Sequence, residues 1–273
     1  MARHNGAAEV AEFLRARRSR LKPADVGLPA GGRRRTPGLR REEVAQLADI
    51  SPTYYTFLEQ GRDVRPSEHV LDALGRALRL TPAERAHLHD MVHGVPAVGA
   101  KTPDTLLPSV ADLVARLDPW PAYVTGRCFD VLACNRAARA LWADWPGRPE
   151  PERNVLWWTF LDPAARAVLT DWESVARAEL ARLRSASARR PDDPRFGTLI
   201  AELQEGSVEA RRWWPEHDVV PLSSGMKRIW HPALGVIEFQ HVVLQVADDP
   251  EQKLVTFTAS PQDAARIGAL IGD

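Results

Sequence analysis

Two neighbouring stretches between residues 39 and 62 carry apolar residues at helical spacing. The first stripe consists of Leu39, Val44, Leu47 and Ala48. It ends at Asp49, and the second stretch opens with Ser51, a favourable N-cap. Pro52 follows at the first helical position, where its missing amide hydrogen costs nothing. The pattern predicts a helix up to residue 48 and a second over about 52–60, stopped by Gly61.

Small and apolar side chains indicate how these two helices meet. Ala45 lets the second helix cross close over the first, Ile50 fills the corner, and Tyr55 and Leu58 face inward. Asp49 stands where such turns usually carry glycine, and aspartate tolerates a left-handed backbone better than most residues. A helix-turn-helix, whose second helix lies in the DNA major groove, has this arrangement. An ordinary helical hairpin fits the geometry equally well.

The residues of this pair favour the first interpretation. EEVAQLADIS followed by YYTFLEQGR resembles the XRE-type family of bacterial repressors. In that family a Leu-Glu-x-Gly segment closes the recognition helix, as Leu58-Glu59-Gln60-Gly61 does here. The resemblance implies that residues 52–60 read DNA.

Phe57 departs from that family, because its position often carries a polar or basic base reader. Phenylalanine cannot hydrogen-bond a base edge, although it can touch a thymine methyl group. Either Pro52, Thr53 and Thr56 carry the readout, or this chain has weakened sequence specificity. The expected DNA contacts are Arg33, Arg34, Arg35, Arg40, Arg41, Ser51, Pro52, Thr53, Thr56, Phe57 and Arg62.

Charge is distributed unevenly along a chain of 273 residues whose net charge is zero. Residues 1–62 hold 12 Lys and Arg against 7 Asp and Glu, and residues 101–273 hold 20 against 24. A basic head of +5 on an acidic body of −4 fits a DNA-binding module joined to a sensory domain. The cations of the loop at 22–37 would neutralise phosphates, enter the minor groove as an arm, or only be solvated.

Three further helical patterns complete an all-α five-helix domain that ends near residue 94. They cover 9–21, 67–79 and 82–93, and a capping box of Thr81 and Glu84 opens the last. His87, His89 and His93 lie on that helix, but we expect no metal site, because one helix supplies too few ligands and no acidic or cysteine cluster accompanies them. Cys128 and Cys134 support neither a zinc site nor a disulfide.

The pattern changes beyond a linker at 95–108, which is rich in glycine and proline. Strands alternate with helices in this part. The expected helices cover 110–117, 135–145, 164–190, 196–205 and 261–271. The expected strands are two within 121–135, then 218–222, 226–231, 235–246 and 253–259.

All nine tryptophans lie beyond residue 119. Tryptophan fills cores, and it also lines apolar pockets. The candidate ligand-binding residues are Trp142, Arg153, Asn154, Trp157, Trp172, Trp214 and His217. Arg153 would form either a bidentate pair with a ligand carboxylate or a structural salt bridge to Asp162 or Asp171.

Several segments of this second part share their order and spacing with one family. RCFDVLACNRAARALW, ERNVLWWTFLDPAAR, DWESVARAELARLR, PDDPRFGTLIAEL, WWPEHDV and SGMKRIWHPALGVIEF resemble the MmyB-like transcription regulators. The resemblance covers about residues 9–271. It implies an XRE-type helix-turn-helix joined to a PAS-like ligand-binding domain, with a fatty acid or similar apolar molecule as ligand.

The expected fold is α+β, with an N-terminal helical domain and a C-terminal domain built on an antiparallel sheet. The expected bounds are 1–94, a linker at 95–108, and 109–273. Double-stranded DNA and a small apolar ligand are the expected partners, and a homodimer would read paired half-sites. No apolar run is long enough to cross a membrane and the N-terminus lacks a signal core, so we expect a cytoplasmic protein without membrane contact or cofactor.

Two alternatives remain. Asp130, His217-Asp218 and His231 offer acid–base groups for an enzyme, but the motifs of common hydrolases, zinc proteases and nucleotide-binding folds are absent, and we expect no catalytic residue. A protein-interaction adaptor with a degenerate helix-turn-helix is the other alternative, and Phe57 is the residue that supports it.

Overall fold

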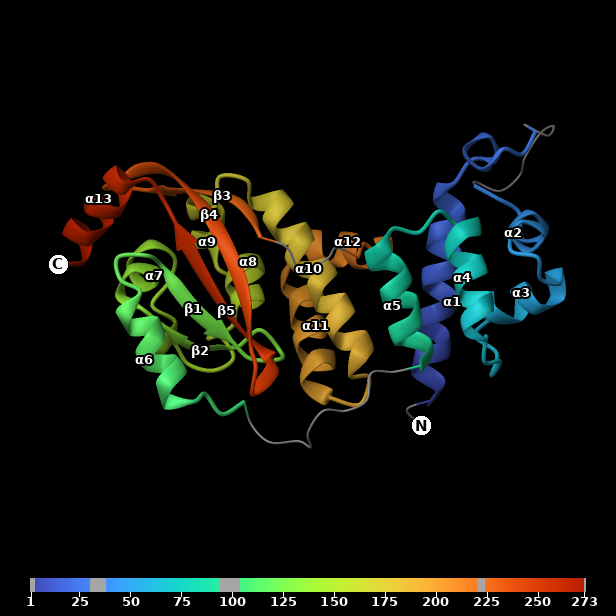
Figure 1. Cartoon of the computed structure of the whole chain (residues 1–273), viewed down its shortest axis with the longest axis horizontal. Coiled ribbons are helices and arrows are strands. Elements are labelled where there is room, and N and C mark those ends of the chain that lie inside the picture. The colour runs from blue at the N-terminus through green and yellow to red at the C-terminus, as the bar shows by residue number, and fades with distance from the viewer. Residues whose placement is uncertain (1–2, 30–37, 94–103, 220–223, 273) are drawn as a thin grey trace. The chain divides into compact units, whose positions relative to one another are not determined.

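The computed structural model describes residues 3–29, 38–93, 104–219 and 224–272. The chain divides into two compact units (Figure 1). Unit 1 comprises residues 1–97, 184–194 and 213–220, and unit 2 comprises residues 98–183, 195–212 and 221–273. The boundary between the units divides one long helix, α10 (Trp172–Arg189). Its residues up to 183 belong to unit 2, and those from 184 belong to unit 1.

Unit 1 contains the five α-helices that the sequence predicts. They are α1 (Arg3–Arg20), α2 (Arg41–Leu47), α3 (Pro52–Glu59), α4 (Glu68–Ala77) and α5 (Pro82–His93), and a 3₁₀ turn lies at Pro23–Val26. The α5 bounds agree with the prediction, because Thr81 Oγ1 accepts from the Glu84 amide at 3.3 Å and Glu84 Oε2 accepts from the Thr81 amide at 2.7 Å. Their shared core includes Phe13, Leu14, Leu39, Val44, Tyr55, Leu74 and Leu88.

The turn between α2 and α3 has the predicted chemistry. Asp49 adopts a left-handed backbone with φ of 53°, and Ser51 Oγ accepts a hydrogen bond from the Tyr54 amide at 3.1 Å. Ala45 is fully buried, and its carbonyl accepts from the Ile50 amide at 3.0 Å. The small side chain and the left-handed residue together allow a turn of four residues between the two helices.

Unit 2 is built on a five-stranded sheet in the order β2-β1-β5-β4-β3, with every neighbouring pair antiparallel. Its strands are β1 (Ala122–Thr125), β2 (Val131–Cys134), β3 (Gly225–His231), β4 (Gly235–Val246) and β5 (Asp249–Thr258). Ile237 and Phe239 of β4 are buried while the residues between and beside them are exposed. That alternation turns one face of the sheet toward the core.

The remaining helices of unit 2 pack on this sheet and on one another. Helix α6 contacts β1 and β2, α13 contacts α7, and α9 contacts both α8 and β3 (Figure 1). Their bounds are α6 (Pro108–Arg116), α7 (Arg136–Leu141), α8 (Val155–Leu161), α9 (Pro163–Val168), α11 (Pro194–Gly206), α12 (Val208–Trp213) and α13 (Pro261–Ile271). Short 3₁₀ turns occupy Trp145–Gly147 and Trp214–Glu216. None of the helices in the described residues is long and apolar enough to cross a membrane.

The single helix predicted over 164–190 is wrong, because the chain forms α9 and α10 with a break at 169–171. Leu169 leaves the helix to form a bridge with Ile229, and the Thr170 amide donates to the Arg228 carbonyl at 3.3 Å. Arg228 also pairs with Asp171, at 2.9 Å. Bonds to β3 therefore replace the helical bonds that local propensity favours.

Two other elements differ from the sequence prediction. The helix expected over 135–145 ends at Leu141, and a separate 3₁₀ turn that contains Pro146 follows at Trp145–Gly147. The strand expected over 218–222 is wrong in its described part, because Asp218 and Val219 form no strand. They follow directly after a 3₁₀ turn and His217, whose backbone is left-handed (φ 53°). Residues 220–222 lie outside the described residues. Helices α8 and α12 had no counterpart in the prediction.

Replacement of Asp49 tests the turn between α2 and α3. Asp49→Val places a β-branched side chain at positive φ, so we expect the free energy of unfolding to fall by about 1–2 kcal/mol. Asp49→Gly is the matched control, with a change within about 0.5 kcal/mol. Urea unfolding followed by circular dichroism measures both, and equal stability of the two variants would contradict the assigned turn.

Candidate functional site

The outer face of α3 carries the residues expected to meet DNA. Pro52 and Thr53 are exposed, and Thr56 and Phe57 are half-buried beside them. The Thr56 hydroxyl donates to the Pro52 carbonyl at 2.8 Å, so its hydrogen is committed within the helix. Pro52 has no amide hydrogen, which leaves the Thr53 hydroxyl as the freest hydrogen-bonding group in this set. The structure places all four residues on α3, with Pro52 and Thr53 at its amino-terminal end.

Phe57 is covered by a cation, since the Arg62 guanidinium lies 4.3 Å from the centre of its ring. Arg62 Nε also donates to Gln60 Oε1 at 2.9 Å. These contacts hold Arg62, just past the end of α3, on the same side as Phe57. A cation at this place suits a phosphate next to the groove that the helix would enter.

Glu59, the acidic residue of the Leu-Glu-x-Gly segment, is fully buried at the end of α3. Its carboxylate accepts hydrogen bonds from Arg18 Nε at 2.5 Å, Arg41 Nε at 2.7 Å and the Tyr55 hydroxyl at 2.9 Å. Burial alone would raise the pKa of Glu59, but these donors hold it below its ordinary value. The four residues, here named the Glu59 cluster, join α1, α2 and α3.

Sequence reasoning missed this role of Glu59 and assigned Arg41 to DNA. The available signal was the spacing of Tyr55 and Glu59, which places a carboxylate four residues after an inward-facing tyrosine. Arg41 now has a structural partner, although its side chain stays 44% exposed. Its Nε atom donates to Glu59, and the exposed part of its side chain faces solvent.

The other expected DNA-contacting residues fall in two places. Arg40 is exposed at the start of α2, where its amide donates to Glu43 Oε2 at 2.6 Å. Ser51 caps α3 through its hydroxyl, as predicted from the sequence. Arg33, Arg34 and Arg35 lie outside the described residues.

Five of the seven candidate ligand-binding residues lie in unit 2, and the side chains of Asn154 and Trp172 have hydrogen-bond partners within the protein. Asn154 caps α8 by accepting from the amides of residues 156 and 157, and its Nδ2 donates to the Cys128 carbonyl at 2.7 Å and Asp130 Oδ1 at 3.0 Å. Trp172 Nε1 donates to the Thr159 carbonyl at 2.8 Å. Trp157 is half-buried. These bonds explain the polar residues as supports of the fold.

Arg153 is exposed, and its Nε donates to the Arg148 carbonyl. The two acids that the sequence offered as partners bind other cations. Asp162 pairs with Arg148 at 2.5 Å, and Asp171 pairs with Arg228 at 2.9 Å. The expected salt bridge from Arg153 to either acid is therefore replaced by these two pairs.

Trp142 belongs to the aromatic core of unit 2, where its ring centre lies 4.6 Å from that of Phe257. Next to this core lies a group of polar residues that the sequence did not single out. Lys227 Nζ lies 5.7 Å from the centre of the Phe257 ring and 3.8 Å from Glu179 Oε1. We name Tyr123, Glu179, Arg182 and Lys227 the Lys227 cluster.

Tyr123 and Glu179 of the Lys227 cluster are buried, Arg182 and Lys227 are half-buried, and some of their polar atoms lack partners. Among the described residues, Glu179 Oε2, Arg182 Nε and the indole nitrogens of Trp145 and Trp158 are buried without a hydrogen-bond partner. Burial lowers the pKa of Lys227, and burial with the nearby Glu179 charge raises the pKa of Tyr123. Unpaired polar atoms inside a protein are rare and costly, and they frequently mark the place of a ligand or water.

Trp214 and His217 fall in unit 1, apart from the other five candidates. The Arg184 guanidinium lies 4.0 Å from the centre of the Trp214 ring and bonds the Trp214 carbonyl, and Arg184 Nη1 lies 3.1 Å from His217 Nδ1. Arg17 of α1 donates to the His217 carbonyl. We name these four residues the Arg184 cluster.

Burial lowers the pKa of His217 to about 4, and the neighbouring Arg184 charge acts in the same direction. Burial also lowers the pKa of Arg184, to about 10. The imidazole is therefore neutral at pH 7, where one of its nitrogens can accept from Arg184.

Comparison with known proteins gives two family matches and one curated relative. The family model described as the MmyB-like transcription regulator ligand binding domain matches residues 106–270, and a helix-turn-helix domain model matches residues 9–88. The HTH-type transcriptional regulator DdrOP3 of Deinococcus deserti is 35% identical over 82 residues. That alignment covers 30% of this chain and 58% of the Deinococcus protein.

Truncation of Glu59 tests the Glu59 cluster. Glu59→Ala leaves Arg18 and Tyr55 buried without their acceptor, so we expect the free energy of unfolding to fall by about 3–5 kcal/mol. The contribution of the carboxylate is complete above its ordinary pKa near 4.5 and is lost as pH falls through the lower folded pKa. Urea unfolding at pH 7 measures the loss.

Glu42→Ala removes an exposed acid from the first turn of α2 and serves as the control, with a change below about 0.5 kcal/mol. An equal effect of the two substitutions would show that Glu59 does not hold the three helices together.

Proposed function

Because this chain belongs to the MmyB-like transcription regulators, we propose that its helix-turn-helix binds double-stranded DNA and that a small apolar ligand in its C-terminal domain changes that affinity. A fatty acid is the proposed ligand class. The proposal includes a homodimer that reads paired half-sites and a location in the cytoplasm. The observation that carries it is the exposed amino-terminal face of α3, supported from behind by the buried Glu59 cluster.

The chemistry of α3 supports major-groove binding. A recognition helix must be held rigidly, and the residues near its amino-terminal end contact the base edges. The Glu59 cluster fixes the position of α3, and the Thr53 hydroxyl can hydrogen-bond to several bases. Phe57 offers an apolar surface to a thymine methyl group. Readout in this proposal combines one hydroxyl with van der Waals contacts, and Arg62 adds a phosphate contact.

The Lys227 cluster supports a ligand that joins a carboxylate to an apolar chain. Lys227 and Arg182 supply two half-buried cationic groups. Lys227 Nζ lies 3.8 Å from Glu179 Oε1, whereas among the described residues Arg182 Nε has no hydrogen-bond partner. A bound carboxylate would satisfy the second cation and remove the cost of its burial. Phe257 and Trp142 then border the apolar part of such a ligand.

Helix α10 supports a physical route from that ligand to DNA. Arg182 and Arg184 are two residues apart on one continuous helix, and Arg184 bonds His217, which Arg17 of α1 also contacts. The next residue of α1, Arg18, bonds Glu59 of the recognition helix. A ligand that shifts α10 would bias the position of α1 and α3. It changes DNA affinity only if it binds one arrangement better than the other.

To test the DNA proposal, the purified chain first selects a duplex from a random-sequence pool. The affinity of variants for that duplex is then measured. One hydrogen bond is worth about 1 kcal/mol, so Thr53→Ala should weaken that duplex roughly fivefold and spare a scrambled duplex. Arg62→Ala should weaken both equally and lower the slope of log affinity against log salt by about 1. Fluorescence anisotropy over a salt series measures both effects.

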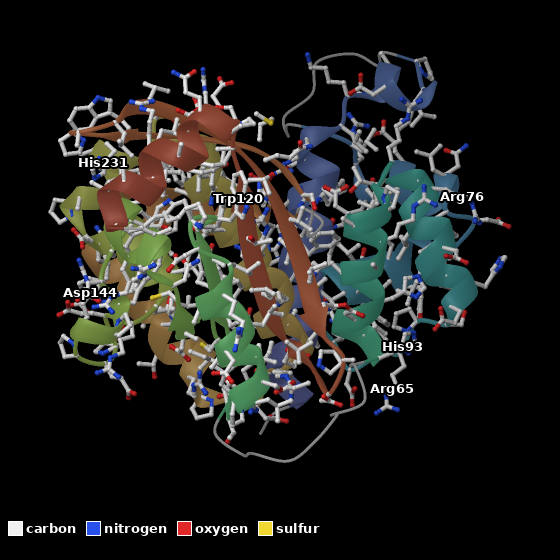
Figure 2. The ribbon with its side chains drawn as sticks, turned by 60° about the vertical axis from the view of Figure 1, so that its left-hand side comes forward. Arg65, Arg76, His93, Trp120, Asp144 and His231 are labelled. Carbon is white, nitrogen blue, oxygen red and sulfur yellow. The ribbon has the colours of Figure 1, made fainter. Side chains whose placement is uncertain are left out.

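Arg76→Ala is the control, because Arg76 projects into solvent from the last turn of α4 (Figure 2). We expect its affinity to match wild type. If the wild type enriches no sequence but Phe57→Gln does, the helix-turn-helix is degenerate and the adaptor alternative replaces the DNA proposal.

Substitutions in the Lys227 cluster test the ligand proposal. Lys227→Met and Arg182→Met keep an unbranched apolar stem but remove the cation, so we expect fatty-acid affinity to fall at least roughly tenfold, equal to about 1.4 kcal/mol. Tryptophan fluorescence during titration with a panel of long-chain fatty acids measures the affinity. Native mass spectrometry of the wild type, before and after denaturation, detects an occupant that copurifies.

Arg228→Met is the matched control, because Arg228 neighbours Lys227 on β3 but pairs with exposed Asp171. Its affinity should equal that of the wild type. Unchanged affinity in Lys227→Met and Arg182→Met, with folding intact, would place the fatty acid elsewhere.

A further inference from the structure

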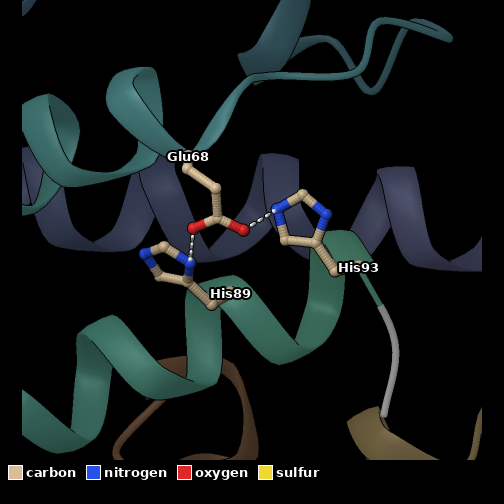
Figure 3. A group of neighbouring side chains, drawn as sticks. All are labelled: Glu68, His89 and His93. Atoms are coloured by element: carbon tan, nitrogen blue, oxygen red, sulfur yellow. Dashed lines mark ion pairs between the residues drawn. The ribbon is translucent and has the colours of Figure 1, made fainter. Parts of the chain in front are cut away.

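Three side chains with metal-binding donors gather where α4 begins and α5 ends (Figure 3). Glu68 is the first residue of α4, and His89 and His93 project from α5. Glu68 Oε2 lies 2.8 Å from His89 Nδ1, and Glu68 Oε1 lies 3.0 Å from His93 Nε2. One donor atom from each residue lies within 4.8 Å of the other two. The carboxylate stands between the two imidazoles.

The local sequence accounts for this arrangement. His89 and His93 are four residues apart, which places them on the same face of α5. The α4–α5 hairpin returns the chain so that the last turn of α5 lies beside the start of α4. Asp72, one turn after Glu68, has Oδ1 3.6 Å from His89 Nε2, on the side of the ring away from Glu68. Such an outer carboxylate orients a metal-ligating imidazole.

These residues answer the objection raised from the sequence. Along the sequence, α5 alone supplies too few ligands, and no acidic or cysteine cluster accompanies its histidines. The fold brings Glu68 and Asp72 from another helix to the two histidines. Two imidazoles and one carboxylate form a donor set that binds Zn²⁺ and other divalent first-row transition metals.

We propose that Glu68, His89 and His93 form a binding site for a divalent first-row transition-metal ion, of which Zn²⁺ is the representative. The side chains are 69%, 26% and 43% exposed, so an ion reaches them without any opening of the fold. Three protein ligands leave at least one coordination position for water. The Glu68 carboxylate now contacts both imidazoles directly. On binding, these side chains would move slightly apart so that each donor atom contacts the ion instead.

The ion would connect the beginning of α4 to the end of α5. In its absence, exposed ion pairs like these contribute little to stability. With the ion bound, the two helix ends are held by coordinate bonds that the unfolded chain cannot form, so binding raises the thermal midpoint of unit 1. The site shares no residue with the proposed DNA-binding face or the Lys227 cluster.

Calorimetric titration of the untagged, EDTA-treated full chain with Zn²⁺ at pH 7.5 tests the site. We expect one Zn²⁺ per chain with a dissociation constant in the micromolar range. His89→Ala, His93→Ala and Glu68→Gln should each weaken binding at least roughly tenfold. His69→Ala is the matched control, because His69 is exposed on α4 next to Glu68 but does not belong to the cluster.

Thermal unfolding with and without Zn²⁺ gives a second readout. The ion should raise the midpoint of the wild type and His69→Ala but not that of the double variant His89→Ala/His93→Ala. All four positions are partly exposed, so circular dichroism should confirm that each variant folds. Absence of Zn²⁺ binding in the wild type, or equal binding by the wild type and the double variant, would overturn the proposal.

Discussion

One buried carboxylate, that of Glu59, fixes the geometry of the DNA-binding unit. A fully buried anion is stable only when several donors surround it, and Arg18, Arg41 and Tyr55 meet that need from three helices. Because each donor occupies a separate helix or turn, the requirement to neutralise one charge also sets the position of α3. The outer face of α3 can then carry small side chains such as Thr53 without loss of rigidity.

Unit 2 satisfies its buried charges less completely. Its sheet and aromatic core are packed around Phe239 and Phe257, yet among the described residues Glu179 Oε2 and Arg182 Nε are buried without a hydrogen-bond partner. An unsatisfied buried polar atom costs free energy, and in the proposed function a bound carboxylate would satisfy Arg182. The same helix, α10, supplies Arg184 to the cluster that contacts α1. Helix α10 thus carries residues of both clusters.

Local signals allowed much of the fold to be predicted from the sequence. Ser51 and Pro52, the capping box at Thr81, and the left-handed preference of Asp49 act within a few residues, and each is confirmed. The strands 235–246 and 226–231 followed from alternation. These elements depend little on distant contacts, so a single sequence specifies them.

Contacts between distant residues could not be predicted in this way. Glu59 and Arg18 are 41 residues apart, and the break between α9 and α10 depends on Arg228, 57 residues beyond Asp171. The approach of Glu68 to His89 likewise follows from helix packing. The sequence placed seven residues in one ligand pocket, whereas Trp214 and His217 fold into unit 1. Composition identified the aromatic domain but not the residues that share a site within it.

The most direct test of a ligand-regulated DNA-binding protein is one comparison of affinities. The dissociation constant of the full chain for its enriched duplex would be measured by fluorescence anisotropy, with and without a saturating fatty acid that the chain binds. We predict a change of at least roughly fivefold, the lower range of allosteric coupling. Equal dissociation constants, with fatty-acid binding confirmed in the same samples, would contradict regulation of DNA binding by that ligand.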